Sequence, residues 1–275
     1  MKHVLVICAM IAVTSGCTGS KKAVRSGDDI YGSRAYRYFL SGNLLSAAEI
    51  YKKGFISARN ADNMYMSAQY LANIGRIYFE LDRFDSAAVY LAKSHNEFVR
   101  LDDTAAASKA AAFLALCHAA KGDGAQAHQW FSAASAYKGR NFTHYLAVIK
   151  SRIDWQLSSK ISNEKNLEKA RAFYKKKRDL STLATIAILK ADTELSKSNC
   201  AAASRLLSEA LSYFDKTAET YRRGKTLVKL ASVNFCAGND DAGKHFYERA
   251  LDCVPRGILL PTFDQVSACD GIRCR

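Results

Sequence analysis

Apolar positions follow a helical period along most of this chain, and polar turn residues interrupt that period at regular intervals. Residues 68–94 show the pattern most clearly, with two apolar helical faces separated by the polar segment 82–85. The first face consists of Leu71, Ile74, Gly75 and Tyr78, and the second consists of Ala87, Ala88, Leu91 and Ser94. Two short helices joined by a tight link form a helical hairpin, which is the element that we predict here.

The hairpin pattern recurs about every forty residues along the chain. Its turns fall near positions 42, 82, 122, 165, 198 and 238. Self-similarity at a fixed period indicates a stacked array of like units. The whole chain also contains only two prolines, so little interrupts its helices. We therefore predict an all-α fold, an α-solenoid of about six helical hairpins.

The second unit carries a small residue, an aromatic, a turn residue, an alanine and a further apolar residue at fixed offsets. These residues are Gly75, Tyr78, Asp82, Ala87 and Leu91. Their spacing resembles the motif of the tetratricopeptide repeat (TPR) family; the first, third and sixth units repeat it, whereas the fourth and fifth are degenerate. The period exceeds that family's unit of about 34 residues, so we expect longer helices or wider links. The resemblance implies a concave groove lined by the first helix of each hairpin.

The beginning of the chain has the features of an export signal. Residues 4–16 carry no charge and follow Lys2, and they are fewer than the roughly 20 that a membrane-spanning helix needs. Residues 13–17 resemble the end of a bacterial lipoprotein signal, in which the last position is a cysteine. That resemblance implies cleavage before Cys17 and attachment of lipid, palmitate included, at Cys17. The alternative is an ordinary export signal that contains a cysteine.

These observations divide the chain into four expected parts. Residues 1–16 are the lipoprotein signal peptide, and 17–33 are a lipidated N-terminus and polar tether. Residues 34–257 are the TPR-like solenoid, and 258–275 are a C-terminal tail with cysteines. Since Thr18 rather than aspartate follows the cysteine, we expect the protein in the cell envelope, anchored at the outer membrane and facing the periplasm.

The chain is strongly basic, with a formal net charge of +14. A basic surface suits nucleic acid, anionic lipid or an acidic protein. An exported chain does not meet nucleic acid, so we expect no nucleic acid partner. The tyrosines and phenylalanines fall at the packing positions of the repeat, where we expect them to form core. Solvated helix faces are the alternative explanation of the charge.

Six cysteines follow Cys17, and an oxidising compartment favours disulfides between them. We predict a disulfide between Cys200 and Cys236, because the helix ends that carry them meet at one edge of the solenoid. Cys253 is then expected to reach Cys269 or Cys274, leaving Cys117 as a free buried thiol. No cysteine spacing indicates a metal site, and we expect no cofactor.

The TPR resemblance implies groove positions that lie between the packing residues of the first helices. They are Asn73, Arg76, Lys109, Phe113, Arg152, Trp155, Lys225 and Lys229. Basic and amide side chains suit peptide carboxylates, and the aromatics suit an apolar anchor. Ordinary solvated residues are the alternative.

No catalytic or phosphate-binding motif occurs in the chain, so we do not expect an enzyme. We predict a membrane-anchored scaffold for protein–protein interaction, which binds a partner protein or peptide, acidic in character, in its concave groove. One alternative is an envelope enzyme with a cryptic site in the degenerate fourth unit, around His144, Asp154 and Trp155. The other is a purely structural envelope lipoprotein.

Overall fold

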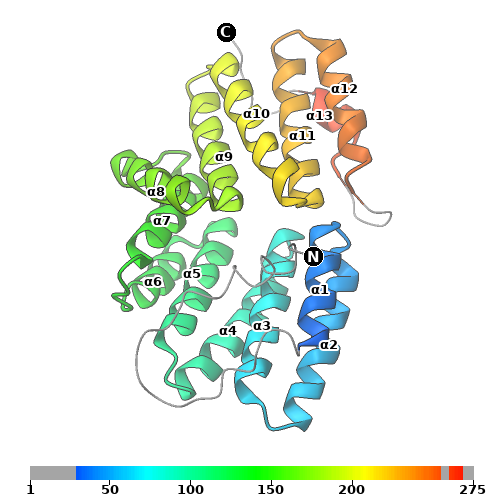
Figure 1. Ribbon diagram of the computed structural model, residues 1–275. Helices are drawn as coiled ribbons and strands as arrows, with labels where there is room; N and C mark the ends of the chain where they lie inside the picture. The colour runs from blue at the N-terminus through cyan, green and yellow to red at the C-terminus, as the bar shows by residue number, and fades with distance from the viewer. Residues whose placement is uncertain (1–28, 255–259, 269–275) are drawn as a thin grey trace.

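A computed structural model describes residues 29–254 and 260–268, and all regular structure in these ranges is helical. Twelve of the helices form six consecutive hairpins, which confirms the predicted all-α solenoid (Figure 1). The helices are α1 (Ile30–Leu40), α2 (Leu44–Asn60), α3 (Met64–Glu80), α4 (Phe84–Arg100), α5 (Thr104–Ala120), α6 (Gly124–Ala134), α7 (Phe142–Ser158), α8 (Glu164–Lys177), α9 (Leu180–Ser196), α10 (Cys200–Thr217), α11 (Thr220–Cys236), α12 (Asp240–Leu251) and α13 (Phe263–Ser267).

Many links between the described helices share one local structure, which explains the turn residues in the sequence. A residue with positive φ ends one helix, and an Asn or Asp then caps the next helix by accepting a hydrogen bond from a backbone N–H; α4, α7, α11 and α12 begin without such a bond. Gly122 (φ 78°) followed by Asp123 is one example. Ser198 (φ 61°) followed by Asn199 is another. Glycine, and less often a short polar residue, tolerates positive φ, while Asn and Asp are strong N-caps.

The fourth hairpin departs from this pattern, and here the predicted turn near 165 is wrong. Its link covers 159–163, so position 165 already lies in α8. Ser159 has positive φ (53°), and the Asp154 carboxylate accepts hydrogen bonds from the backbone and hydroxyl of Ser162. This side chain holds the longer link in place.

Close contacts between helices depend on small residues. The sequence spacing predicted such a contact at Gly75. A Cβ atom there would lie 2.6 Å from Leu91 Cγ and 3.2 Å from the Ala87 carbonyl oxygen. Leu91 fills the space beside Gly75, whereas Tyr78 is half-buried and stacks on Tyr90 with 5.4 Å between ring centroids. The α3–α4 contact therefore leaves no room for a side chain at position 75.

The solenoid turns back on itself. In Figure 1, α1–α5 form the lower part, α9–α13 form the upper part, and α6–α8 join them on the left. The first turn of α11 returns to the beginning of the chain, where Tyr221 joins the buried cluster that contains Ala35, Leu44 and Ile74. The first helices of the hairpins thus surround a common interior. No described helix has the length and apolarity that a bilayer crossing requires.

Candidate functional site

Four of the predicted groove residues come together on three successive first helices. Arg76 comes from α3, Lys109 and Phe113 come from α5, and Arg152 comes from α7. The Arg76 guanidinium lies 5.4 Å from the centre of the Phe113 ring, and Arg152 lies 5.2 Å from that of Phe79. We call Arg76, Lys109 and Arg152 the inner cluster. Within the described chain, none of the three has a carboxylate at salt-bridge distance.

Burial makes these unpaired charges costly. It lowers the pKa of Lys109 and is the largest effect there; the negative charge of Asp103 acts to raise that pKa, and the positive charge of Arg76 has a smaller lowering effect. Burial also lowers the pKa of Arg152. A charge removed from water without a partner destabilises the fold, so the inner cluster is a place where an anion would be stabilising.

Tyr145 adds a hydroxyl to the inner cluster. Its Oη atom is buried and has no hydrogen-bond partner within the described residues. Burial raises the pKa of Tyr145 to about 12, while Arg76 and Arg152 act to lower it. The group is therefore a protonated hydroxyl in the field of two guanidinium groups, able to donate to a ligand oxygen.

Besides Asp103, which acts on Lys109, the carboxylate of Glu80 acts on the two arginines of the inner cluster. Burial acts to raise its pKa, but the positive charges of Arg222, Lys225, Arg152 and Arg76 outweigh burial, and the pKa of Glu80 is lowered. Arg222 Nε is 4.0 Å from Glu80 Oε1, the separation at the limit of an ion pair. Glu80 is thus ionised beside several cations at neutral pH.

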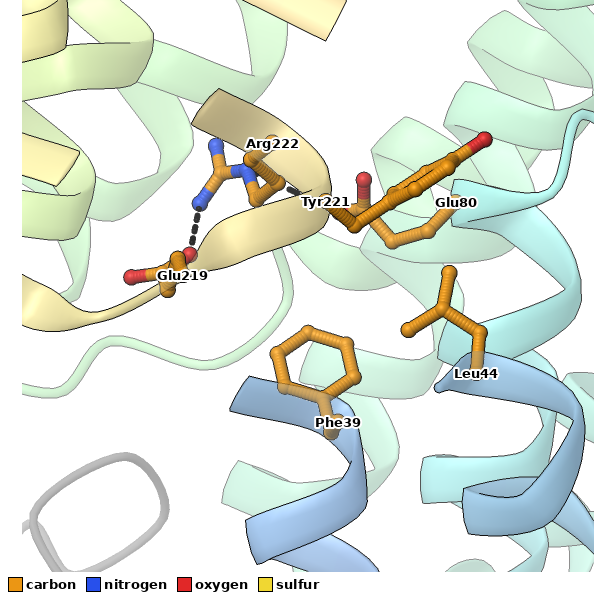
Figure 2. Close-up of a pocket in the computed structure, with 6 residues that line it drawn as sticks. All are labelled: Phe39, Leu44, Glu80, Glu219, Tyr221 and Arg222. Atoms are coloured by element: carbon orange, nitrogen blue, oxygen red, sulfur yellow. Dashed lines mark hydrogen bonds and ion pairs between the residues drawn. The ribbon is translucent and has the colours of Figure 1, made fainter. Parts of the chain in front are cut away.

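Arg222 is the best-connected cation of the interior. Its guanidinium donates to Ser181 Oγ at 2.8 Å, to Thr185 Oγ1 at 2.5 Å and to Glu219 Oε2 at 2.9 Å. It therefore joins α9 to α11, and Figure 2 shows it between Glu219 and Glu80. These bonds leave Arg222 with a structural role.

The other predicted groove residues lie elsewhere or are engaged. Lys225 Nζ pairs with Asp82 at 2.9 Å, and Lys229 Nζ pairs with Asp192 at 2.6 Å. Trp155 packs against the buried cluster of Val148, Leu167, Ala170, Ile186 and Leu189. Asn73 is half-buried on α3, and its side-chain amide has no hydrogen bond to any described group.

The three residues of the alternative enzymatic site do not converge. His144 stacks on Phe173, with ring centroids 4.3 Å apart. Asp154 is bound by Lys150 and Ser162. Asp154 follows His144 by ten positions on α7, about 15 Å along the helix axis. In the described ranges, no three potential metal-ligating side chains gather in one place.

The cysteines follow the predictions in part. Cys117 is a free buried thiol, as predicted, and Cys200 and Cys236 are both disulfide-bonded. Their pairing with each other stays a prediction. The expectation for Cys253 is wrong, because its thiol is free. Its Sγ atom is buried in the α11–α12 core, where it accepts a hydrogen bond from Arg223 Nη1 at 3.0 Å. Residues 17, 269 and 274 lie outside the described chain.

Sequence reasoning missed Tyr145, Glu80 and Arg222, although a signal for each was present. Tyr145 precedes Arg152 by seven positions, Glu80 follows Arg76 by four, and Arg222 precedes Lys229 by seven. Each spacing places its two residues on one helical face. Extending the groove positions by helical periodicity finds these residues, whereas the search for repeat offsets does not.

Comparison with known proteins shows the fold. No family model matches the chain, and no curated protein matches it. Among solved structures, the chain is similar to the Rap conjugation gene regulator of the plasmid pLS20, determined in complex with the Phr* peptide, with a TM-score of 0.62 and 14% sequence identity. The match covers 81% of this chain but 60% of the regulator, so the chain spans less than two thirds of that protein's length. The chain has a TPR-like helical repeat fold.

Proposed function

We propose that this protein is a scaffold that binds a peptide or protein segment of acidic character on the inner face of its solenoid. The observation that carries the proposal is the inner cluster: three partly buried cations, none of which has a carboxylate at salt-bridge distance among the described residues. Most buried charges in proteins are paired. A ligand carboxylate would provide that pairing.

The chemistry of the inner cluster suits a peptide. Two guanidinium groups and one ammonium group offer charge-assisted hydrogen bonds to carboxylates, and the Tyr145 hydroxyl offers one more donor. The partly buried Phe113 ring beside Arg76 offers apolar surface next to the charges, whereas the Phe79 ring beside Arg152 is buried in the core. The complex of the similar Rap regulator with a peptide supports a peptide ligand for this fold.

A binding role also agrees better with the site than catalysis does. Catalysis by acid and base needs titratable groups within hydrogen-bond reach of one reacting atom. Here His144 and Asp154 are each engaged by other side chains and lie far apart. The similar regulator is likewise named for regulation and peptide binding, which supports a non-enzymatic protein.

We further propose that residues 1–16 direct export and that Cys17 carries lipid, which anchors the scaffold at the outer membrane on the periplasmic side. The uncharged segment 4–16 supports export. The disulfide-bonded state of Cys200 and Cys236 supports an oxidising compartment. Metabolic labelling with a palmitate analogue should mark the wild type and leave Cys17→Ser unmarked. Equal labelling of the two would contradict the anchor.

Binding is tested by a peptide array. Short peptides of one length are spotted in matched pairs, in which Asp and Glu of one member are replaced by Asn and Gln in the other. The full chain should bind the acidic peptides and not their amide counterparts, since only the acidic peptides carry negative charge that can pair with the cations of the inner cluster. Equal binding to both members of the pairs would refute an acidic ligand.

A further inference from the structure

The outward face of α8 carries a row of lysines. Leu167 and Ala170 are buried and pack α8 against residues of α7 and α9. Successive residues of a helix turn by about 100°, which places Lys165, Lys169 and Lys176 on the side opposite to that core. All three residues are exposed, and we call them the lysine face.

The charge of the lysine face is not neutralised within the described chain. Glu168 of the same helix pairs with Lys190 of α9 instead, with 2.7 Å between Oε1 and Nζ. None of the three lysines has a carboxylate at salt-bridge distance among the described residues. Lys175 and Arg178, which are also exposed, extend the positive charge to the end of the helix.

The second helices of the other hairpins are more balanced in charge. Counting Lys, Arg, Asp and Glu, α4 and α10 each carry two cations and two carboxylates, and α12 carries two cations and three carboxylates. Three cations face one carboxylate on α2, and α8 has six cations and two carboxylates. Among these outer helices, the positive charge of the chain is therefore concentrated on α8.

The stability of α8 itself does not explain the lysine face. Cations at the end of a helix are favoured by its dipole, which accounts for Lys175, Lys176 and Lys177 in the last turn. Lys165 lies in the first turn, where the same dipole disfavours a cation, and Lys169 follows one turn later. The row of charge thus extends over the part of the helix that gains nothing from it.

We propose that the lysine face docks on the anionic headgroups of a lipid bilayer. Eleven positions separate Lys165 from Lys176, so the row is about 16 Å long. Lysine is a hydrated point charge on a flexible stem, which suits a diffuse anionic surface better than a shaped site. The cores of protein interfaces are depleted in lysine and enriched in aromatics, and only the small Ala172 lies among these lysines.

Docking through α8 is compatible with a ligand on the inner face. Figure 1 shows α8 at the left edge of the solenoid, away from α1 and α11. The inner cluster lies on α3, α5 and α7, which are first helices, whereas α8 is a second helix. The lysine face does not depend on the proposed peptide binding. The choice of a bilayer as its partner rests in part on the proposed lipid at Cys17, which would keep a membrane close.

The test is co-sedimentation with vesicles of residues 17–275 carrying Cys17→Ser, which keep every described helix and cannot be lipidated at that position. The protein should bind vesicles of phosphatidylcholine that contain phosphatidylglycerol, it should not bind pure phosphatidylcholine, and added salt should release it. Lys165→Glu/Lys169→Glu/Lys176→Glu should weaken binding on the order of tenfold. The matched control is Lys53→Glu/Lys93→Glu/Lys244→Glu, an equal charge change at exposed positions of α2, α4 and α12, which should keep most of the binding.

Two outcomes would overturn the proposal. Equal losses in the two triple variants would show that net charge alone attracts the vesicles. Loss of binding to duplex DNA, with vesicle binding unchanged, in the α8 variant would assign the lysine face to nucleic acid. Because neither measurement uses an acidic peptide or a lipidated Cys17, the proposed peptide binding and the proposed anchor can each fail while the lysine face is confirmed.

Discussion

Cations line the interior of both parts of the solenoid, but only those of the second part are paired. On α11, Arg222, Lys225 and Lys229 each form a salt bridge. On α3, α5 and α7, the inner cluster is unpaired within the described chain. All of these side chains come from first helices of hairpins, so position in the repeat does not distinguish them.

Pairing therefore separates the two kinds of cation. Arg222 satisfies its donors with Glu219, Ser181 and Thr185 and holds helices together. Glu80 acts to raise the pKa of Arg152, but no carboxylate lies at salt-bridge distance from the Arg152 guanidinium in the described chain. We infer that the first kind stabilises the fold and that the second is kept for a ligand, at a cost to stability.

Replacing Arg222 should have the largest effect. Arg222→Met leaves Glu219, whose side chain is 2% exposed, without its counter-ion. We expect the free energy of unfolding to fall by about 3–5 kcal/mol, measured by urea denaturation. Arg152→Met is the matched control, since it removes a similarly placed guanidinium without orphaning a salt-bridge partner, and should cost little or stabilise. An equal loss in both variants would erase the distinction.

Replacing Lys109 should stabilise the free protein and weaken binding. Because burial lowers the pKa of Lys109, folding disfavours its charged form. Lys109→Met removes that charge and keeps a long side chain, so we expect a gain of about 1 kcal/mol in the free energy of unfolding and a lower affinity for acidic peptide. Thermal melts and peptide titration measure the two quantities. A destabilised variant would contradict the assignment of this charge as unpaired.

Acid should weaken the fold in part through Glu80. Its pKa in the folded protein is lowered below the ordinary value of 4.5 because the nearby cations outweigh burial. Its contribution is therefore complete above about pH 4.5 and is lost as pH falls through the lowered pKa. Glu80→Gln should reduce the pH dependence of the unfolding midpoint in that acidic window and leave its slope at higher pH unchanged. An unaltered acidic profile would place Glu80 outside the charge network.

The smallest effect is expected at Lys229. The Lys229 side chain is 45% exposed, whereas that of its partner Asp192 is 11% exposed. Because Gln keeps a hydrogen-bond donor for Asp192 and water reaches this end of the pair, Lys229→Gln should lower the free energy of unfolding by about 1 kcal/mol and leave acidic-peptide affinity unchanged. A marked loss of affinity would extend the ligand site to α11, as the sequence first suggested.

Much of the fold could be predicted because repeats encode local structure. The pairs Gly122–Asp123 and Ser198–Asn199 mark links through positive φ and capping, which depend on a few neighbouring residues. The fourth link escaped prediction because Asp154 holds it from the preceding helix. That bond spans eight positions and follows no repeat offset.

The site could be predicted only in part, for a physical reason. Helical periodicity places Arg76 and Lys109 on inner faces, and the structure brings them together. Periodicity does not reveal that Lys225 and Lys229 find carboxylates, because their partners Asp82 and Asp192 come from other units. Lys225 meets Asp82 only since the solenoid turns back on itself. A repeat motif describes contacts between neighbouring units and contains no information about such a return.

The most direct test of the inner cluster is a titration of one acidic peptide against two triple variants of equal charge change. The first is Arg76→Glu/Lys109→Glu/Arg152→Glu. The second is Lys175→Glu/Lys176→Glu/Lys177→Glu, at exposed positions of α8. We predict that the first loses affinity on the order of a hundredfold and that the second stays close to the wild type. Equal losses in the two variants would show that net charge alone attracts the peptide and would contradict a site at the inner cluster.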